Sequence, residues 1–287
     1  MTTTAKEATD KISGVSETLM ITLYARYIES QRQDAILQDN KAAEIVEKID
    51  YDFSKYAQGW ASQLGCVIRA EVYDHLVSQF IQKHPQATII NLGAGLCTRF
   101  FRVDNGKITW YEVDFPEVID LKRKLIEESD CATRSAGGDR YRFIASSILE
   151  ATWIEEIQRV APVLIIMEGV SMYLTEIEMK TLFQNITRDL APVTILMDVI
   201  ASKRAKNTQK HDTVSKTNAK FKWGLDNSKE LENWQQELTV TDEVYYLTRF
   251  ANYPHRLPWW GRYLRFILVA VFKNFGRVIQ VQITQSA

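Results

Sequence analysis

The stretch TIINLGAG at residues 88–95 decides how the rest of the chain is interpreted. An apolar, largely β-branched run ends at Leu92, and Gly93 and Gly95 follow at once, which is typical of a buried strand that turns sharply into the next segment. The two glycines let the backbone turn and let a ligand approach where a Cβ atom would collide. An ordinary tight turn between a strand and a helix gives the same pattern, so the glycine pair alone is weak evidence for a binding site.

A second strand that ends in an acid strengthens the binding-site interpretation. Residues 108–113 form this strand, and Asp114 lies 21 residues after Gly93. An acid at this distance is placed to hold the ribose hydroxyls of a nucleotide or nucleoside. Thr98 stands where the dinucleotide fingerprint has its third glycine, which argues against a nicotinamide enzyme. A nucleoside ligand without a pyrophosphate fits better, and S-adenosylmethionine is the obvious candidate.

Composition limits the other possibilities. A length of 287 residues fits one large domain or a domain with an appendage, and 46% hydrophobic residues are ample for a large core. A formal charge of −1 gives no long-range attraction for nucleic acid. The three cysteines lack metal-ligand spacing and are odd in number, so we expect a reducing, cytoplasmic location and no metal. We expect no signal peptide, and the apolar run at residues 266–272 is too short to span a membrane.

Helical periodicity predicts three helices ahead of the first strand. The first is capped by Ser16 and carries an apolar stripe as far as Ile28, and the others cover residues 41–48 and 66–83. We interpret residues 1–86 as an N-terminal helical cap that is part of the same globular unit as the rest of the chain.

From residue 87 to residue 287 the pattern alternates between strands and helices. We predict strands at residues 88–92, 108–113, 141–145, 163–167, 193–199, 239–247 and 277–283. Thr175 and Glu178 form a capping box, and a further helix is predicted near 258–272. Residues 129–139 read as a surface loop and residues 201–224 as a lid or insertion. The predicted fold is α/β, with a mostly parallel sheet of seven strands and helices on both faces.

Short segments at residues 14–19, 91–96, 112–118, 168–174 and 221–224 occur in an order that resembles the leucine carboxyl methyltransferase family. That family includes O-methyltransferases of polyketide biosynthesis, and the last two segments look more like this small-molecule branch than the branch that modifies protein phosphatases. The resemblance implies a Rossmann-like class I methyltransferase that uses S-adenosyl-L-methionine and has an antiparallel last strand.

The resemblance also implies which residues hold the cofactor. This set comprises Arg26, Arg69, Gly93, Ala94, Gly95, Asp114, Ser147, Ile148 and Glu168. Within it, Asp114 would bind the ribose, Arg69 the methionine carboxylate, and Glu168 would lie near the methionine amino group. Ser147 stands where the family usually has an Asp that contacts the adenine amino group. A hydroxyl can still accept a hydrogen bond there, but it brings no charge.

Structural interpretations stand beside these roles. Asp114 could cap a helix that begins at Pro116, and Glu112 on the same strand is a rival for the ribose. Arg69 could be an exposed helix residue, and a solvated helix face is the simpler interpretation for Arg26. Trp259 and Trp260, like the aromatic residues at 221–224, could be core residues or pocket walls.

The expected chemistry follows from the activated sulfonium methyl group. The enzyme must hold an oxygen nucleophile in line at about 3 Å and exclude water. A carboxylate acceptor needs no general base, whereas a phenol or alcohol benefits from one. The candidate bases by residue type are Tyr73, His75, His211 and His255, and none has a partner spacing that requires a catalytic role.

We therefore predict an O-methyltransferase that acts on a hydroxyl or carboxyl group of a small, specialised-metabolite acceptor, with Tyr173, Phe221 and Trp223 as substrate-binding residues. Two other classes stay open. One is a protein C-terminal carboxyl methyltransferase, with a partner surface on the N-terminal cap. The other is a catalytically silent nucleoside-binding or scaffolding protein, which Ser147 in place of the usual acid suggests. The sequence does not predict the oligomeric state.

Overall fold

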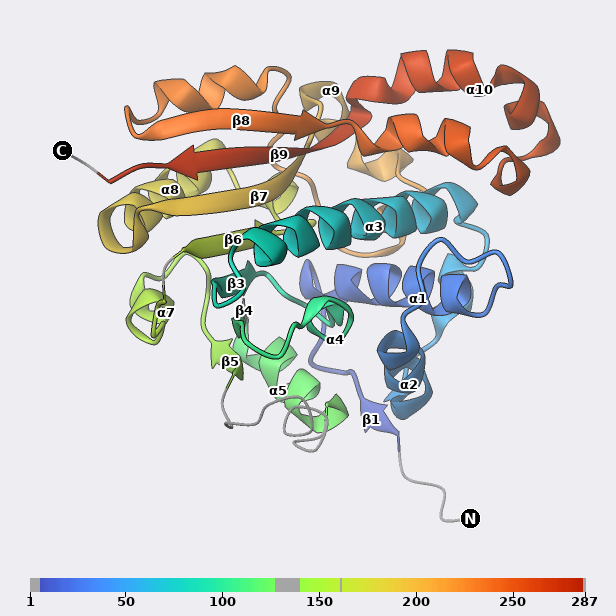
Figure 1. Ribbon diagram of the computed structural model, residues 1–287. Coiled ribbons are helices and arrows are strands. Elements are labelled where there is room, and N and C mark those ends of the chain that lie inside the picture. Colours follow the sequence, from blue (N-terminus) through green and yellow to red (C-terminus); the bar gives the residue numbers. More distant parts are fainter. Residues whose placement is uncertain (1–5, 127–139, 161, 286–287) are drawn as a thin grey trace.

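The computed structural model describes residues 6–126, 140–160 and 162–285. Its centre is a seven-stranded sheet with the order β5-β4-β3-β6-β7-β9-β8 (Figure 1). The strands are β3 (Thr88–Leu92), β4 (Thr109–Asp114), β5 (Tyr141–Ala145), β6 (Val163–Met167), β7 (Val193–Ile200), β8 (Leu238–Val244) and β9 (Gly276–Ile283). Neighbouring strands are parallel except at β9, which runs antiparallel to both β7 and β8. The predicted α/β fold and its antiparallel last strand are confirmed.

The strand order places a ligand crevice at the middle of the sheet. The chain enters the sheet at β3, moves outward through β4 to β5, and then returns to β6 on the other side of β3. Open α/β sheets bind ligands outside the carboxyl ends of the strands where the order reverses in this way. The glycine turn at residues 93–95 follows β3 at this point.

Helices cover both faces of the sheet because alternate residues of each strand point to opposite sides. Ile89 lies in a core shared with α1 (Leu19–Ser30), α3 (Trp60–Lys83) and α5 (Pro116–Leu125). Ile90 lies in a second core with α8 (Glu176–Leu190). In Figure 1, α3 crosses in front of the sheet and α8 lies beside β7.

The start of the chain differs from the prediction in two places. Ser16 does not cap a helix, because residues Ser16–Thr18 form a 3₁₀ turn (η1) and α1 begins after it without a side-chain capping bond. The third helix, α3, begins at Trp60 rather than at residue 66, with Gly59 at its N-cap. Gly65 hides this start, because glycine is unfavourable inside a helix and suggests that the helix begins after it.

The remaining short elements connect these parts. They are β1 (Glu7–Ala8), α2 (Asn40–Lys48), β2 (Ile49–Asp50), η2 (Phe53–Tyr56), α4 (Arg99–Val103), α7 (Thr152–Glu155), η3 (Ser171–Tyr173), α9 (Ser202–Ala205), η4 (Thr208–Lys210), η5 (Val214–Lys216) and η6 (Ser228–Asn233). Thr175 and Glu178 form the predicted capping box at the start of α8. The loop predicted at 129–139 lies outside the described residues.

The end of the chain is helical where a longer strand was expected. β8 ends at Val244, and the 3₁₀ segments η7 (Tyr246–Asn252) and η8 (Pro254–Arg256) lead to α10 (Trp259–Phe272) and η9 (Lys273–Phe275). Aromatic residues after Val244 suggested that the strand continues. Tyr246 instead belongs to η7 and faces the interior, where 8% of its surface is exposed. Within the described parts of the chain, no helix is both long and apolar enough to cross a membrane.

Candidate functional site

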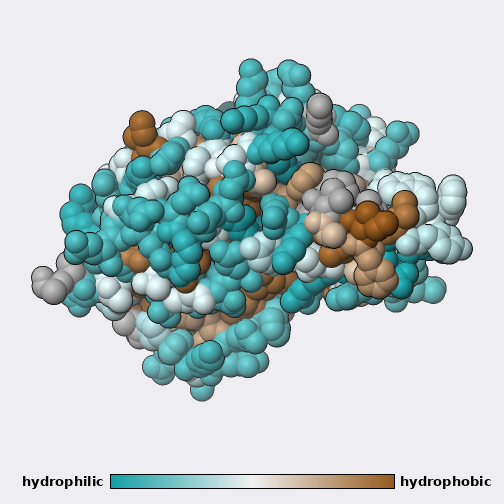
Figure 2. All heavy atoms as spheres, turned by 90° about the horizontal axis from the view of Figure 1, so that it is seen from above, coloured by the Kyte–Doolittle hydropathy of each residue, from teal (hydrophilic) through white to brown (hydrophobic). Residues whose placement is uncertain are grey.

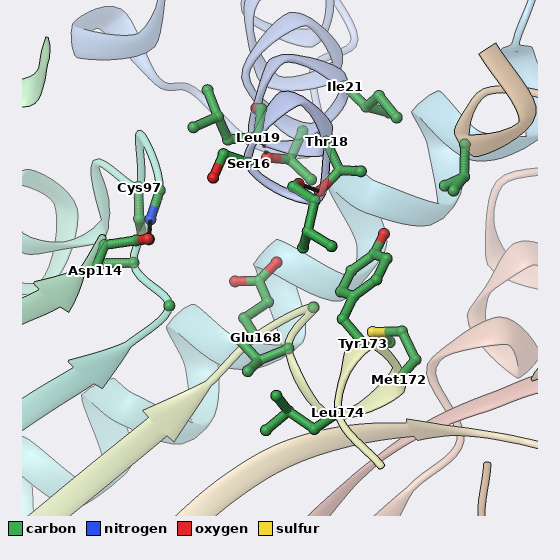
Figure 3. Close-up of a pocket in the computed structure, with 18 of the residues that line it drawn as sticks. Ser16, Thr18, Leu19, Ile21, Cys97, Asp114, Glu168, Met172, Tyr173 and Leu174 are labelled. Atoms are coloured by element: carbon green, nitrogen blue, oxygen red, sulfur yellow. Dashed lines mark hydrogen bonds between the residues drawn. The ribbon is translucent and has the colours of Figure 1, made fainter. Parts of the chain in front are cut away.

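A cavity of about 500 Å³ lies at the carboxyl ends of β3, β4 and β6, within the size range of small-molecule sites. The turn after β3, the first turn of α1 and parts of residues 200–222 complete its walls. Figure 3 shows Asp114 on one side, Glu168 and Tyr173 rising from below, and the first turn of α1 above them.

The glycine turn brings backbone to the cavity wall. Gly93 has φ +64°, and a Cβ atom there would lie 2.5 Å from a methyl carbon of Val170. A side chain is therefore excluded both by the backbone conformation and by the neighbouring residue. Ala94 and Gly95 line the cavity beside Gly93.

Asp114 ends β4 and faces the glycine turn. Its carboxylate accepts hydrogen bonds from the backbone N–H groups of Gly95 (2.6 Å) and Phe115 (2.7 Å). Burial raises the pKa of Asp114 to about 6, against the effect of these two hydrogen bonds. Asp114 is not the N-cap of α5, since Phe115 holds that position. Glu112, the rival for the ribose, is fully buried in an ion pair with Lys122 and does not line the cavity.

Glu168 follows β6 and is held between two arginines. Arg69 Nε donates to its Oε1 (3.0 Å), and Arg99 Nη2 donates to its Oε2 (2.5 Å). Burial alone would raise the pKa of Glu168, but the guanidiniums of Arg99 and Arg69 outweigh burial and hold it at about 2. Glu168 is therefore a carboxylate at any working pH.

Asp198 is a buried partner of the cavity residues Arg69 and Gly169 that the sequence analysis missed. It is fully buried near the end of β7, where Arg69 Nη1 (3.1 Å), the Gly169 N–H (2.6 Å) and the Tyr73 hydroxyl (3.3 Å) donate to its carboxylate. Burial raises the pKa of Asp198, and Arg69 opposes that effect. The signal that could have found it is an acid inside the apolar run 193–200, because a charge there needs a buried partner.

The ion pairs continue from Glu168 toward α1. Arg99 also pairs with Asp74 (2.7 Å), and Arg26 donates to Asp39 (2.9 Å) and to the carbonyl of Leu96 (2.8 Å). Arg26 is 6% exposed, so its interpretation as a solvated helix residue is wrong. Arg102 links these two sets of ion pairs, because it contacts both Asp39 and Asp74. This charge network comprises Arg26, Arg69, Arg99, Arg102, Asp39, Asp74, Glu168 and Asp198.

Of the four candidate bases, His211 lines the cavity and the other three do not. Tyr73 is fully buried, and burial raises its pKa well above the ordinary value. His75 is exposed on α3, and His255 lies at the surface with Nε2 3.2 Å from Asp34. Burial, aided by Arg204, lowers the pKa of His211 to about 4, so its ring is neutral near pH 7.

Four further residues predicted for the cofactor or substrate site line the cavity. Ser147 and Ile148 line the cavity, and the Ser147 hydroxyl accepts a hydrogen bond from the Leu149 N–H (3.3 Å). Tyr173 and Phe221 also line it, with ring centroids 5.5 Å apart.

Three tryptophans lie elsewhere. Trp223 is not among the lining residues and instead packs beside Trp234 in the second core, with ring centroids 5.8 Å apart. Its expected place in the substrate site is therefore corrected to a packing position. Trp259 and Trp260 are exposed on α10 and form no wall of the cavity.

Comparison with known proteins identifies the family. The family model described as leucine carboxyl methyltransferase matches residues 19–187. The chain belongs to the leucine carboxyl methyltransferase family. It is an S-adenosylmethionine-dependent methyltransferase.

Curated relatives in this family cover most of the chain. The tetracenomycin polyketide synthesis O-methyltransferase TcmP of Streptomyces glaucescens is 30% identical over 226 residues, which cover 78% of this chain and 80% of TcmP. The S-adenosyl-L-methionine-dependent methyltransferase dpfgK of Gibberella zeae is 28% identical and covers 92% of each chain.

Solved structures agree on the fold. A DUF574 family protein from Streptomyces avermitilis gives a TM-score of 0.57 at 11% identity, covering 93% of this methyltransferase and 97% of that chain. Magnesium protoporphyrin IX methyltransferase (ChlM) from Synechocystis, solved with bound SAH, gives 0.50 at 8% identity over 86% and 94% of the two chains.

The cavity residues fit the cofactor of this family. Backbone at residues 93–95 can approach a ligand without steric conflict, and the Asp114 carboxylate beside it can accept ribose hydroxyls. Arg69 and Glu168 present opposite charges to the same cavity, as the carboxylate and amino group of a methionine moiety require.

Proposed function

We propose that this methyltransferase transfers the methyl group of S-adenosylmethionine to an oxygen atom of a small, planar, acidic acceptor. The observation that carries the proposal is a cluster of aromatic rings beside an arginine on one wall of the cavity. There the ring of Phe221 lies beside two others, with its centroid 5.5 Å from that of Tyr173 and 5.8 Å from that of His211, and Arg204 lines the same space. Aromatic walls with an adjacent cation suit an aromatic acid or a phenolate.

In this proposal the cofactor supplies an electrophilic methyl group, and the chain orients the two reactants. Asp114 accepts the ribose hydroxyls, the turn at 93–95 lies against the methionine end, and Arg69 and Glu168 bind the methionine carboxylate and amino groups. Ser147 accepts from the adenine amino group. Because the charge network holds Arg69 and Glu168 in place, these groups need little reorganisation on binding.

Arg204 is the group assigned to the acceptor's charge. Within the described residues, no carboxylate lies within ion-pair distance of its guanidinium, which instead lies 5.6 Å from the ring of Phe275. A carboxylate or phenolate acceptor would supply the missing counter-charge in a partly desolvated site, where an ion pair is stronger than in water.

His211 is assigned as a hydrogen-bond donor rather than a base. Its Nδ1 accepts a hydrogen bond from the Val214 N–H (3.3 Å), so the neutral ring carries its proton on Nε2. The Nε2–H can donate to an acceptor oxygen and orient it. Burial raises the pKa of Tyr173 to about 12, against a hydrogen bond with Thr18, so Tyr173 is also a poor base. An acceptor that is already ionised suits this site, since it needs no general base.

The test is methyl transfer from labelled cofactor to a panel of aromatic acids, phenols and uncharged aromatic alcohols. We expect transfer to the acids or phenols, and base treatment of the product distinguishes a labile ester from a stable ether. Arg204→Gln should raise KM for the ionised acceptor about ten-fold or more, in line with loss of a charged hydrogen bond. Lys222→Gln is the matched control, because Lys222 lines the same cavity but lies 3.6 Å from Glu178. Transfer to a protein C-terminus alone would reject the proposal.

A further inference from the structure

The helix α10 exposes several large apolar side chains. Trp259, Tyr263, Phe266 and Ile267 recur at helical spacing on one face and are 75%, 83%, 67% and 61% exposed. Seen from the side on which α10 lies, the surface gathers apolar atoms over this helix (Figure 2). Single exposed apolar residues are ordinary, but a contiguous patch of large ones marks an interaction surface.

The segment that carries this patch is basic. Residues 245–287 contain six lysines and arginines and no aspartate or glutamate. Arg249 pairs with Glu71 and Arg256 with Glu29, so their charges are compensated. Arg277 is buried 3.4 Å from Glu243, which leaves Arg262, Arg265 and Lys273 on or next to α10.

Three of these cations have no acidic partner. Arg262 and Lys273 are exposed, and Arg265 lies with its guanidinium 4.6 Å from the ring of Phe266. In the part of the chain that the structure describes, no carboxylate lies within ion-pair distance of any of the three. The patch therefore combines an apolar, aromatic face with an uncompensated positive edge.

We propose that α10 docks the protein on the surface of an anionic phospholipid bilayer. The face with Trp259, Tyr263, Phe266 and Ile267 enters the interfacial region, where tryptophan and tyrosine are favoured, and Arg262 and nearby cations contact the headgroups. The helix lies in the plane of the surface, since its 14 residues are too few to span the apolar core.

Charge favours a bilayer over a second copy of the chain. A symmetric dimer through α10 would bring the same patch of each copy together, and with it Arg262, Arg265 and Lys273 of both copies. Like charges without acids between them oppose such an interface, whereas anionic headgroups neutralise them.

Docking would also place the bilayer close to the cavity. α10 packs on η7, and Tyr246 at the start of η7 lines the cavity. An aromatic acceptor dissolved in the membrane could then reach the enzyme without crossing bulk water.

The test is flotation of the full chain with vesicles of phosphatidylcholine alone and of phosphatidylcholine mixed with phosphatidylglycerol. We expect at least ten-fold stronger partitioning to the anionic vesicles, weakened by added salt. The double substitution Phe266→Glu and Ile267→Glu should reduce this partitioning at least ten-fold, and Arg262→Gln with Lys273→Gln should reduce its dependence on anionic lipid.

The matched control is Ile177→Glu, which adds a charge at a 77% exposed apolar residue on α8, away from α10. It should bind vesicles like the unaltered protein, and all variants should keep their affinity for S-adenosylhomocysteine. Equal flotation with both vesicle types, or loss of binding in Ile177→Glu as large as in the α10 variant, would overturn the proposal. So would sedimentation as a dimer that the α10 substitutions dissociate without any vesicle binding.

Discussion

Asp114 combines two properties that seldom occur in one carboxyl group. In the proposed function it accepts two ribose hydroxyls, which it does strongly only when ionised, yet burial raises its pKa to about 6. The N–H groups of Gly95 and Phe115 hold it in place and limit that rise. Its ionisation therefore falls within the pH range of ordinary binding assays.

The first prediction concerns this titration. Well above its pKa the carboxylate is ionised, so affinity for S-adenosylhomocysteine should be level above about pH 7 and fall as pH drops through about 6. Asp114→Asn should lower the affinity about ten-fold or more near neutral pH and abolish the dependence near pH 6. Calorimetry across this pH range is the measurement. Asp120→Asn, an exposed acid on α5, should keep the dependence of the unaltered protein; a flat profile in that protein would contradict the assignment.

The second prediction concerns Ser147. In the family an Asp usually stands at this position, and a charged acceptor forms a stronger hydrogen bond to the adenine amino group than a hydroxyl does. Ser147→Asp should therefore raise the affinity for S-adenosylhomocysteine about five-fold. The analogue that carries hypoxanthine in place of adenine lacks this amino group and should gain nothing. An equal gain for both ligands would mean that Ser147 does not face the adenine.

The sequence predicted the roles of some single residues and not of others. Asp114 and Glu168 follow apolar strands, so their position at the ligand edge could be inferred from the strand pattern. Asp198 and Arg99 were missed as partners, because which buried charges meet depends on how α3, α4 and β7 pack. Arg26 was misread for the same reason: its neighbours in sequence do not reveal Asp39 and Leu96 beside it.

At the scale of elements, the charge network ties the N-terminal helices to the sheet. α1 supplies Arg26, α3 supplies Arg69 and Asp74, α4 supplies Arg99 and Arg102, and the ends of β6 and β7 supply the acids beside the cofactor cavity. Four arginines face four carboxylates, so the buried charges balance. Removing one member leaves a buried charge without compensation.

The third prediction is that Arg99→Leu destabilises the protein by about 3–5 kcal/mol, because Glu168 and Asp74 each lose one of their two arginine partners and the buried network is left one positive charge short. Denaturant unfolding measures this. Arg188→Leu, which removes an exposed pair with Asp189, should leave stability unchanged. A similar loss in both variants would show that the network has no special role.

Glu168 adds a pH dependence to the same experiment. Its pKa is about 2 in the folded state and 4.5 ordinarily, so its stabilisation is complete above pH 4.5 and is lost as pH falls through 2. Arg99→Leu removes one of the two compensating cations and raises the folded-state pKa, so this stabilisation should be smaller and its loss should be complete at a higher pH.

Elements were predictable where local pattern and tertiary packing agree. The bounds of β3, β5 and β6 match the prediction. β3 and β6 are buried along their whole length, as their largely apolar runs between two helix layers require. The strand expected at 239–247 was too long, because the aromatic residues at 245–247 fit a strand locally but pack as η7 against α3 and α10. Local sequence does not carry that tertiary contact.

At the scale of the whole molecule, residues 201–224 close one side of the cavity and bind to the N-terminal part of the chain. Asp212 accepts hydrogen bonds from the backbone N–H (3.3 Å) and hydroxyl of Ser62, and Lys216 Nζ donates to the carbonyl of Lys55 (2.5 Å). We propose that residues 201–224 act as a lid and residues 1–86 as a cap, and that these contacts hold the lid shut.

The fourth prediction tests this lid. Asp212→Ala removes the contact with Ser62, so amide hydrogen exchange at residues 208–217 should accelerate about ten-fold. Exchange in β3 and β6 should not change, because these strands belong to the core. Asp189→Ala, a surface acid on α8, serves as the control. Unchanged exchange at 208–217 would mean that other contacts hold this segment.

The charge network also bears on how this enzyme can be recombined with its relatives. A chimera joined near residue 86 would take Asp39 and Asp74 from one parent and Arg99 and Arg102 from the other. Any parent with a different charge pattern would leave buried ions unmatched across the joint. Exchange of residues 201–224 cuts none of these pairs, so that segment is the better graft for altering acceptor choice.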